Sequence, residues 1–240
     1  MMRNRQQAAL VTGGSKRLGK SISLALAERG YDIALHYRTS RETAEQTAEA
    51  IREYHVQCRT FQCDLNDLQK TGQLVSRVLD TLPHCGLLVN NASVFRRNSF
   101  LDTDTEFLEK HLTVNFKAPF ILTRQFALLR KSGHVINMLD TKITRASEQF
   151  FAYTLSKKLL FEFTQMAAKD LGPAMRVNGI CPGIILPSSE TSEEVLEKMI
   201  RKLPLRQQGT TEDILRGLYY LIDNKFVTGD CLFIDGGEHL

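Results

Sequence analysis

The stretch Thr12-Gly13-Gly14-Ser15-Lys16-Arg17-Leu18-Gly19 decides the fold, because it joins an apolar strand to an amphipathic helix. Residues 8–11 form a short apolar run typical of a buried strand, and apolar residues then recur at helical spacing until Gly30, where we expect the helix to end. A helix N-terminus offers unpaired N–H groups, and glycine lets backbone approach a ligand closely. The turn is therefore expected to hold a phosphate, and a dinucleotide is the first candidate.

Three cations support this interpretation over that of a tight turn without a ligand. Lys16, Arg17 and Lys20 fall in the first turns of the helix. Each opposes the helix macrodipole there, at a cost of about 0.3–1 kcal/mol. A bound anion would explain their presence.

The composition is that of one α/β domain spanning residues 1–240. With 42% hydrophobic and 24% charged residues, a chain of 240 residues can bury a large core without cross-links. The net charge of +4 comes from 31 basic and 27 acidic residues that are interleaved along the chain. This interleaving is typical of a solvated surface, and we expect no nucleic-acid partner.

The cysteines suggest neither a disulfide framework nor a zinc site, because none has CxxC spacing and their number is odd. They are Cys58, Cys63, Cys85, Cys181 and Cys231. We expect a reducing, cytoplasmic setting and no metal. No apolar run is longer than a strand, so neither a signal peptide nor a membrane span is expected.

Strand-like and helix-like segments alternate along the chain, which is the βαβ pattern of a parallel sheet. The expected strands lie near 8–13, 32–38, 58–64, 87–92, 134–139, 176–181 and 231–235. They predict a Rossmann-like, doubly wound α/β sheet of about seven parallel strands with helices on both faces. Its ligand site should lie beyond the carboxyl ends of the strands.

Three local signals concern the helices. Thr39 followed by Glu42 has the spacing of a capping box for the second helix, and Asp67 can cap the third. The helical pattern over residues 104–129 contains Pro119. Proline removes a helix hydrogen bond, so we expect a kink or break at that position.

The residues that follow the second strand, His36-Tyr37-Arg38-Thr39-Ser40, include no carboxylate. A fold that selects NAD carries an acid there for the ribose hydroxyls. Arg38 with Thr39 or Ser40 can instead hold a 2′-phosphate, which favours NADPH, unless Arg38 is merely a solvated cation. Asp64, after the third strand, either accepts a hydrogen bond from the adenine amino group or forms a local cap.

A phenol and an ammonium group stand one helical turn apart at Tyr153 and Lys157. A nearby cation stabilises tyrosinate, which lowers the pKa of tyrosine from about 10 and lets the phenol act as an acid near neutrality. The segment Asn90-Asn91-Ala92 precedes this pair along the chain, so the spacing is less readily explained by chance.

With these motifs the chain resembles the short-chain dehydrogenase/reductase family along nearly its whole length. The first turn is similar to the family's TGxxxGxG, with Arg17 in place of the middle glycine. Asn90-Asn91-Ala92-Ser93 is similar to its NNAG, and Pro182-Gly183 to its PG. Asn115 is similar to a third catalytic position beside the Tyr and Lys.

The resemblance implies a role for each catalytic residue. Tyr153 would donate the proton, Lys157 would bind the nicotinamide ribose and lower the pKa of the tyrosine, and Asn115 would help to hold a proton-relay water. Hydride would come from NADPH. The implied cofactor contacts are Gly13, Ser15, Lys16, Arg17, Leu18, Gly19, His36, Tyr37, Arg38, Thr39, Ser40, Asp64, Leu65, Asn91, Ala92, Ser93, Tyr153, Lys157, Pro182, Gly183 and Ile185.

One departure from the family pattern bears on the substrate. Thirteen residues before the tyrosine, where the family usually has serine, stands Asp140. A carboxylate would repel the oxyanion formed when a ketone is reduced. It suits a nitrogen-rich substrate, because it can accept N–H bonds or relay a proton to a C=N nitrogen. Thr141 is a possible substitute hydroxyl, which keeps ketone reduction open.

Three features together resemble the pteridine reductase branch: Arg17 in place of glycine, Phe95 two residues after Asn91-Ala92-Ser93, and Asp140 in place of serine. In that branch a pterin is sandwiched between nicotinamide and a phenylalanine. The implied substrate contacts are Arg17, Ser93, Phe95, Asp140 and Tyr153. Aromatic stacking is worth about 0.5–1.5 kcal/mol beyond area burial. The alternative interpretation of Phe95 is a loop residue that packs on the core. The segment from Phe226 to Leu240 resembles the bacterial dihydromonapterin reductases of this branch.

The segment after Pro182-Gly183 departs from the family pattern. Residues 184–187 lack the threonine that commonly contacts the nicotinamide carboxamide. From Ser188 to Leu205 a polar turn leads into an amphipathic helix. This helix is either a substrate lid or a plain packed helix.

The leading functional hypothesis is hydride transfer from NADPH to a C=N bond of dihydromonapterin, dihydrobiopterin or dihydrofolate. The first alternative is a carbonyl reductase, such as a 3-oxoacyl-acyl-carrier-protein reductase. The second is a protein that binds NADP without catalysis. The family resemblance also implies a homotetramer built through the helices that carry Asn115 and Tyr153.

Overall fold

A single seven-stranded parallel sheet forms the centre of the computed structural model, which describes residues 7–146, 148–187 and 191–240. The strand order is β3-β2-β1-β4-β5-β6-β7, so the order reverses between β1 and β4. The strands are β1 (Gln7–Val11), β2 (Tyr31–Tyr37), β3 (Cys58–Gln62), β4 (Cys85–Asn90), β5 (Gly133–Met138), β6 (Met175–Pro182) and β7 (Cys231–Ile234). The expected α/β fold is confirmed.

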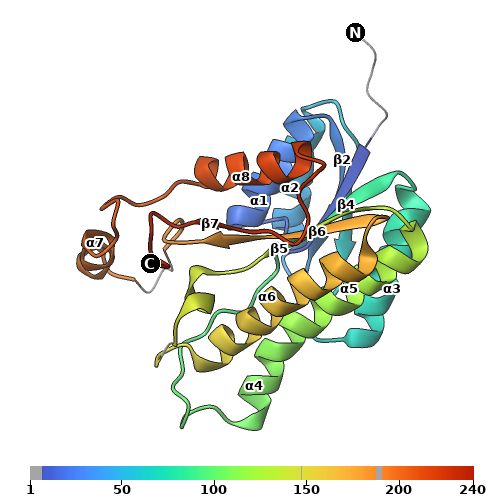
Figure 1. Ribbon diagram of the computed structural model, residues 1–240. Helices are drawn as coiled ribbons and strands as arrows, with labels where there is room; N and C mark the ends of the chain where they lie inside the picture. Colours follow the sequence, from blue (N-terminus) through green and yellow to red (C-terminus); the bar gives the residue numbers. More distant parts are fainter. Residues whose placement is uncertain (1–6, 147, 188–190) are drawn as a thin grey trace.

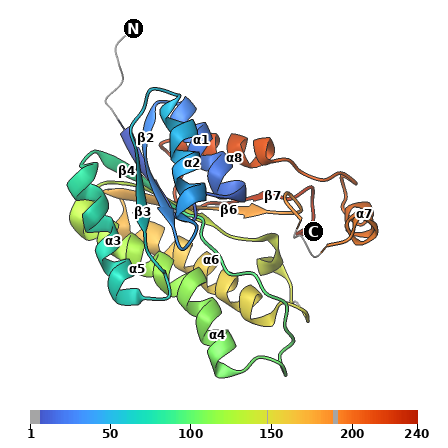
Figure 2. The same ribbon diagram turned by 180° about the vertical axis from the view of Figure 1, so that it is seen from behind.

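Helices cover both faces of the sheet (Figures 1 and 2). One face carries α1 (Arg17–Glu28), α2 (Arg41–Arg52) and α8 (Thr211–Asp223). The other carries α3 (Leu68–Thr81), α4 (Thr105–Leu112), α5 (Ala118–Arg130) and α6 (Phe151–Leu171). A further helix, α7 (Glu193–Arg201), stands at the end of the molecule where the chain finishes.

The alternation of side chains along each strand builds an apolar core on each side of the sheet. In β1, Ala9 and Val11 belong to the core under α1, α2 and α8, whereas Ala8 and Leu10 belong to the core under α3 and α5. All four side chains are fully buried. The sheet is therefore covered on both faces, as a parallel sheet requires.

The start of α2 differs from the expected capping box. The helix N-cap is Ser40, not Thr39, and its side chain makes no cap hydrogen bond. The Ser40 hydroxyl instead accepts a hydrogen bond of 2.7 Å from Nζ of Lys16. The cap of α3 is confirmed, because the Asp67 carboxylate accepts a hydrogen bond from the backbone N–H of Lys70.

The long helical stretch around Pro119 contains a wide turn instead of a break. Residues Thr113–Lys117 form a π-helical turn between α4 and α5, and Pro119 lies in the first turn of α5. Proline has no N–H to donate to the carbonyl four residues earlier, which is that of Asn115. The irregularity therefore falls just before the proline and contains Asn115.

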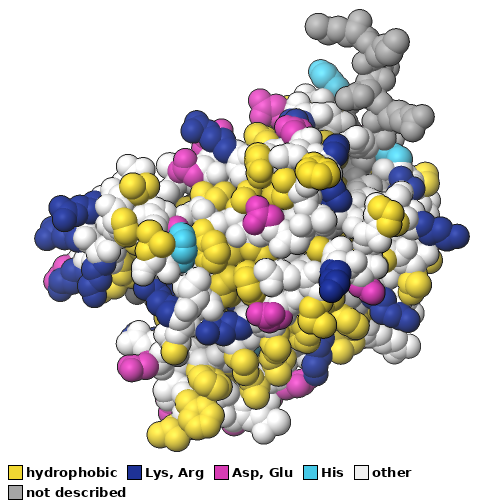
Figure 3. All heavy atoms as spheres, in the orientation of Figure 1, with side chains coloured by type: hydrophobic (Ala, Val, Ile, Leu, Met, Phe, Trp, Pro, Cys, Tyr) yellow, Lys and Arg dark blue, Asp and Glu magenta, His cyan; other side chains and the backbone are white. Residues whose placement is uncertain are grey.

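Helix α7 packs poorly on the rest of the molecule, which disfavours the interpretation of a plain packed helix. None of its residues is buried, and the side chains of Val195 and Met199 are 48% and 38% exposed. Figure 3 shows Lys and Arg side chains gathered at this end of the molecule. Residues 188–190 of the expected lid lie outside the described residues. No helix in the described part of the chain has the length and apolarity needed to cross a membrane.

Candidate active site

The turn between β1 and α1 has the backbone geometry that its glycines allow. Gly13 has a φ of +62°, which glycine adopts readily. A Cβ at Gly19 would lie 2.1 Å from the carbonyl oxygen of Gly13, so only glycine fits. Arg17 also has a positive φ, +50°, at the position where the glycine pattern is broken. An arginine in this conformation costs about 1–2 kcal/mol.

Two side chains expected to contact a cofactor hold this turn in place. Asn91 donates to the carbonyl of Thr12 at 2.9 Å. His36 accepts a hydrogen bond of 3.0 Å from the Gly13 N–H at Nδ1, and its Nε2 lies 3.0 Å from the carbonyl of Cys63. Burial lowers the pKa of His36 to about 4, so the ring is neutral and Nε2 is its donor. The His36 side chain is therefore committed to the shape of the turn.

A cationic corner lies where β2 ends beside the start of α1. Lys16 reaches across to Ser40 with a hydrogen bond of 2.7 Å. Arg38 and Thr39 are exposed next to this contact. The Lys16 ammonium and the Ser40 hydroxyl thus meet, and the exposed Arg38 and Thr39 directly precede Ser40 in the chain. Donors of these kinds bind a phosphate monoester.

The other expected cofactor contacts near the ends of β2 and β3 are Tyr37, Asp64 and Leu65, and most of them can reach a cofactor only through their backbone. The Tyr37 and Leu65 side chains are buried. The Asp64 carboxylate accepts hydrogen bonds from the backbone N–H and side-chain amide of Asn66, at 3.0 and 2.9 Å. This is the local cap that the sequence left as one of two interpretations.

The candidate catalytic residues meet beyond the end of β5. The hydroxyl of Tyr153, on α6, donates to Oδ2 of Asp140 at 2.6 Å. The other carboxylate oxygen accepts from the backbone N–H of Lys142 at 2.8 Å and lies 3.6 Å from its Nζ. Lys157, one turn along α6, donates to the carbonyl of Met138 at 2.6 Å.

These contacts determine the protonation states of Tyr153 and Lys157. Burial raises the pKa of Tyr153 well above its usual value, and the charge of Asp140 and the hydrogen bond to it raise the pKa further. Burial lowers the pKa of Lys157 to about 8. The expectation that Lys157 lowers the pKa of Tyr153 is therefore wrong in this arrangement, because desolvation and the nearby carboxylate prevail. Tyr153 is a neutral phenol that holds its proton.

Asn115 lies in the π-helical turn and fixes the loop after β4. Its Oδ1 accepts hydrogen bonds from the Val94 N–H and the Ser93 hydroxyl, at 2.8 and 3.2 Å. Its amide donates to the Val94 carbonyl and to the Ser156 hydroxyl of α6, at 2.9 and 3.0 Å. The wide turn thus aims Asn115 inward, between the loop after β4 and helix α6.

Phe95 forms an aromatic shelf beside Tyr153. Its ring stacks on Phe150 with centroids 4.5 Å apart and meets the Tyr153 ring edge-on at 4.6 Å. Backbone hydrogen bonds from Asn98 to Gln149 and from Phe151 to Asn98 tie the two segments together. The side chain remains 45% exposed, so it does not pack into the core and can receive a flat ligand.

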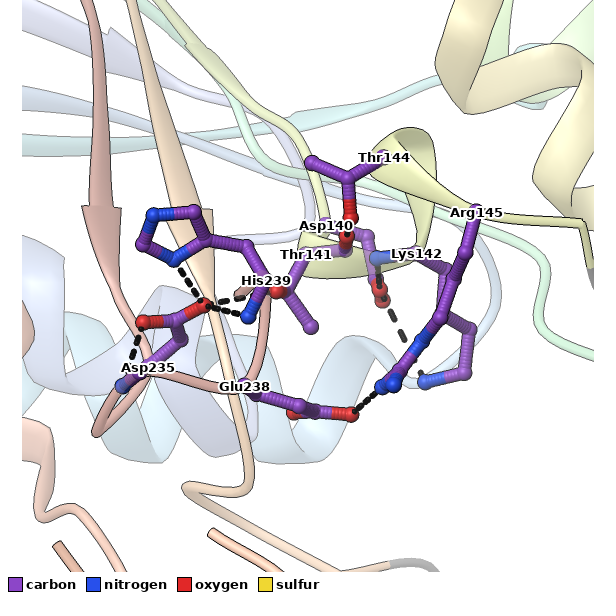
Figure 4. A network of polar contacts seen from close by, with 9 residues as sticks. Asp140, Thr141, Lys142, Thr144, Arg145, Asp235, Glu238 and His239 are labelled. Atoms are coloured by element: carbon purple, nitrogen blue, oxygen red, sulfur yellow. Dashed lines mark hydrogen bonds and ion pairs between the residues drawn. The ribbon is translucent and has the colours of Figure 1, made fainter. Parts of the chain in front are cut away.

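Thr141, the possible substitute hydroxyl, faces away from Tyr153. It is 1% exposed, and its hydroxyl donates to Oδ2 of Asp235 at 2.7 Å. Figure 4 shows this contact and the neighbouring ion pair between Arg145 and Glu238. The hydroxyl is thus bound to the end of the chain, and the carboxylate of Asp140 occupies the place opposite Tyr153.

Arg17 reaches the loop that follows β6. Its guanidinium donates to the carbonyls of Leu186 and Pro187 at 2.7 and 3.1 Å. The side chain of Ile185 is buried there, and its carbonyl accepts from Gln208. Arg17 therefore links the turn between β1 and α1 to the segment that leads to the expected lid.

Four residues of this region did not emerge from the sequence as site residues: Phe150, Lys142, Asp235 and Glu238. No local pattern marks the first two. The acids stand in the C-terminal stretch noted for its resemblance, but its return to the site depends on the pairing of β7 with β6.

The chain is similar to known oxidoreductases along almost its whole length. Residues 14–239 match the family model described as enoyl-(acyl carrier protein) reductase. An uncharacterized oxidoreductase of Mycobacterium tuberculosis is 34% identical, over 99% of this chain and 94% of its own length. The 3-oxoacyl-[acyl-carrier-protein] reductase FabG of Staphylococcus aureus is 28% identical, over 98% of each chain.

A solved structure is also similar along almost the whole chain. It is FolM alternative dihydrofolate reductase 1 from Brucella suis in complex with NADP. The TM-score is 0.91 and the identity is 34%, over 97% of this chain and 94% of that one.

Proposed function

This chain belongs to the short-chain dehydrogenase/reductase family, and from that premise we propose that it uses NADPH to reduce a dihydropteridine to the tetrahydro form. The substrate would be dihydromonapterin, dihydrobiopterin or dihydrofolate, reduced at a C=N bond. One observation carries the proposal: Asp140, not a hydroxyl, faces Tyr153, while the Thr141 hydroxyl is bound to Asp235.

The residues present fit NADPH. The backbone at Gly13 and Gly19 leaves room for the pyrophosphate at the start of α1. Lys16, Arg38 and Ser40 would hold the 2′-phosphate. Bound NADPH supplies the hydride, and Lys157 would bind the nicotinamide ribose.

The proposed substrate contacts follow from the positions of the Phe95 ring and the Asp140 carboxylate. A flat heterocycle would lie on the exposed part of the Phe95 ring, which stacks on Phe150. Asp140 would accept N–H bonds from the ring, since an ionised carboxylate only accepts. Arg17 and Ser93 would complete the contacts, Ser93 from its place beside Asn115.

Proton delivery uses the Tyr153–Asp140 pair. Tyr153 retains its proton at neutral pH and lies in hydrogen-bond contact with Asp140. Reduction adds hydride to the carbon of the C=N bond and a proton to its nitrogen, giving CH–NH. Tyr153 would donate this proton, either directly or through Asp140.

The relatives support both this proposal and its first alternative. The FolM protein is an alternative dihydrofolate reductase, which is the proposed chemistry. FabG is a 3-oxoacyl reductase, which is the carbonyl alternative. A carbonyl oxyanion needs hydrogen-bond donors, and at this site the Thr141 hydroxyl is turned away. The geometry therefore favours the pteridine.

We also propose a homotetramer. Apolar side chains stand exposed on α5 and α6, where Phe120, Leu159 and Met166 are 42%, 38% and 70% exposed. Such surface is typical of an interface between subunits. Light scattering would measure the mass in solution, and a monomer would contradict the proposal.

The testing experiment is a set of initial rates of NADPH oxidation, with NADH in parallel. The substrates are dihydromonapterin, dihydrobiopterin, dihydrofolate and a 3-oxoacyl thioester, and Tyr153→Phe is the catalytic control. Turnover of pterins alone would support the proposal and rank its members. Turnover of the thioester alone would support the carbonyl alternative, and NADPH binding without any turnover would support a non-catalytic role.

A further inference from the structure

The end of the chain returns to the catalytic site along the edge of the sheet. Strand β7 pairs with β6, and Ile234 lies opposite Pro182. Next along, the Gly183 N–H donates to the carbonyl of Ile234 at 3.0 Å. A Cβ at Gly183 would lie 2.6 Å from Cα of Asp235, so the absence of a side chain there lets Asp235 come close to the turn.

The carboxylate of Asp235 is held from several sides. Oδ1 accepts from the Gly237 N–H at 2.9 Å, and Oδ2 accepts from the His239 N–H at 2.9 Å. Oδ2 also lies 2.8 Å from Nδ1 of His239, whose ring stacks on Phe233. Burial alone would raise the pKa of Asp235, but these hydrogen bonds and that from Thr141 outweigh it and lower the pKa. The result is a rigid, ionised acceptor.

This acceptor binds the turn that carries the catalytic carboxylate. Thr141–Thr144 form a 3-10 turn capped by Asp140, and Thr141 donates to Asp235 at 2.7 Å across 94 residues of sequence. Asp140, the N-cap of this turn, accepts the hydrogen bond from the Tyr153 hydroxyl. At the far end of the turn Arg145 pairs with Glu238 (Figure 4).

We propose that Asp235 is a positioning residue for the reaction, and that through Thr141 it holds the 3-10 turn so that Asp140 meets Tyr153. The inference rests on the proposed role of Asp140 and extends the site to the end of the chain. The local cap of the turn fixes only its internal shape. The bond to Asp235 fixes its place relative to the sheet, and a displacement of about 1 Å at a catalytic group can cost on the order of a hundredfold in rate.

The test compares Thr141→Val, which removes the hydroxyl at nearly constant shape, with Thr141→Ser, which keeps the hydroxyl. Asp235→Asn alters the acceptor, and Thr71→Val, a buried threonine in α3, is the matched control. We expect Thr141→Val and Asp235→Asn to lower kcat for the pterin about tenfold or more, with NADPH affinity within twofold. Thr141→Ser and Thr71→Val should stay near the wild-type rate.

Two further measurements separate positioning from general stability. The double variant Thr141→Val with Asp235→Asn should be no slower than the slower single variant, because both break one contact. With 13Cζ-labelled tyrosine, Thr141→Val should move the Tyr153 resonance, identified through Tyr153→Phe, and Thr71→Val should not. This spectrum needs no substrate.

The outcomes are distinct for the two proposals. A wild-type protein that reduces no pterin contradicts the proposed function, while the tyrosine spectrum still decides whether Thr141 positions Asp140. An active wild type with an equally active Thr141→Val, or an unmoved Tyr153 resonance, overturns the positioning role. Equal losses of kcat, NADPH affinity and melting temperature would also overturn it, because they show a general structural defect.

Discussion

The phenol of Tyr153 lies 2.6 Å from the carboxylate of Asp140 and donates a hydrogen bond to it. This contact changes what each of the two groups can do in a reaction. Burial, and after it the carboxylate, keep the phenol protonated, and the phenol occupies one of the hydrogen-bond acceptor positions of the carboxylate. The substrate of such a pair should bring its own N–H donors and accept a proton.

Asp140→Ser should exchange one substrate class for another. The serine hydroxyl can donate to a carbonyl oxygen, whereas the lost carboxylate can no longer accept from a pterin. We expect kcat for the pterin to fall about a hundredfold, within the usual range for an acid–base group, and some 3-oxoacyl activity to appear. Initial rates with both substrates measure this. Asp80→Ser, an exposed change on α3, is the control, and unchanged pterin turnover in Asp140→Ser would remove Asp140 from the mechanism.

Lys157 should set the alkaline limit of activity. Burial lowers its pKa to about 8, while the charge of Asp140 acts in the opposite direction and raises it. The cation that the proposed mechanism uses is present below pH 8 and lost above it, so kcat/KM should decline through that range. In Asp140→Asn the decline should begin at lower pH, because the supporting negative charge is gone. Profiles of kcat/KM from pH 6 to 10 measure this. A decline at the same pH in Asp140→Asn and in the wild type would contradict the coupling between Asp140 and Lys157.

Much of the fold and part of the site follow from local sequence. The run before Thr12, the glycines after it and the spacing from Tyr153 to Lys157 are short-range signals, because each depends on one strand, one turn or one helix. The parallel sheet then follows from their alternation. The approach of Asp140 to Tyr153 is nearly as local, since thirteen residues separate them.

The rest depends on contacts between distant segments. Thr141 is an available hydroxyl in sequence, and only the return of β7 beside β6 shows that Asp235 binds it. Arg17 reaches a loop 169 residues away. The spacing of Lys157 from Tyr153 predicts a lowered pKa for the tyrosine, whereas in the structure burial and the charge of Asp140 raise that pKa. The spacing of residues in the sequence does not show which side chains the fold will bury.

Arg38 should select NADPH over NADH. It stands exposed beside the contact of Lys16 with Ser40, where the 2′-phosphate is proposed to bind. A hydrogen bond to a charged group is worth about 1.5–3 kcal/mol, so Arg38→Ala should raise the NADPH KM about tenfold or more. The NADH KM should stay within twofold. Arg59→Ala removes an exposed cation from β3 as a control, and equal effects on both cofactors would exclude Arg38 from phosphate recognition.

Phe95 should contribute to substrate binding through the exposed part of its ring. Phe95→Leu keeps an apolar side chain but removes the stacking, which is worth about 0.5–1.5 kcal/mol. The pterin KM should therefore rise about two- to tenfold, with the NADPH KM unchanged. Steady-state kinetics with each ligand varied in turn measure both constants. Phe226→Leu, at a fully exposed ring, controls for the chemical change, and an unaltered pterin KM in Phe95→Leu would argue against the sandwich.

His36 should make the protein sensitive to acid. Its pKa is about 4 in the folded protein because the ring is buried, against about 6.5 in an unfolded chain. Between these values only the unfolded chain binds the proton. The contribution of His36 to stability is therefore present above pH 6.5 and is lost as the pH falls toward 4, on the order of 1 kcal/mol per pH unit near pH 5. His134, with a pKa of about 3, acts in the same direction.

Urea unfolding at pH 7, 6 and 5 measures this loss. His36→Asn should be less stable than the wild type at pH 7, because the neutral ring no longer accepts from Gly13, but its free energy of unfolding should fall less steeply with acid. His55→Asn makes the same change at an exposed residue with a φ of +60°, which asparagine tolerates, and should keep the wild-type slope. An identical slope in all three proteins would mean that His36 takes up its proton without disturbing the turn. Because that turn is proposed to hold the pyrophosphate, the NADPH affinity of the folded protein should decline only as the pH falls to about 4, where the buried His36 itself takes up a proton.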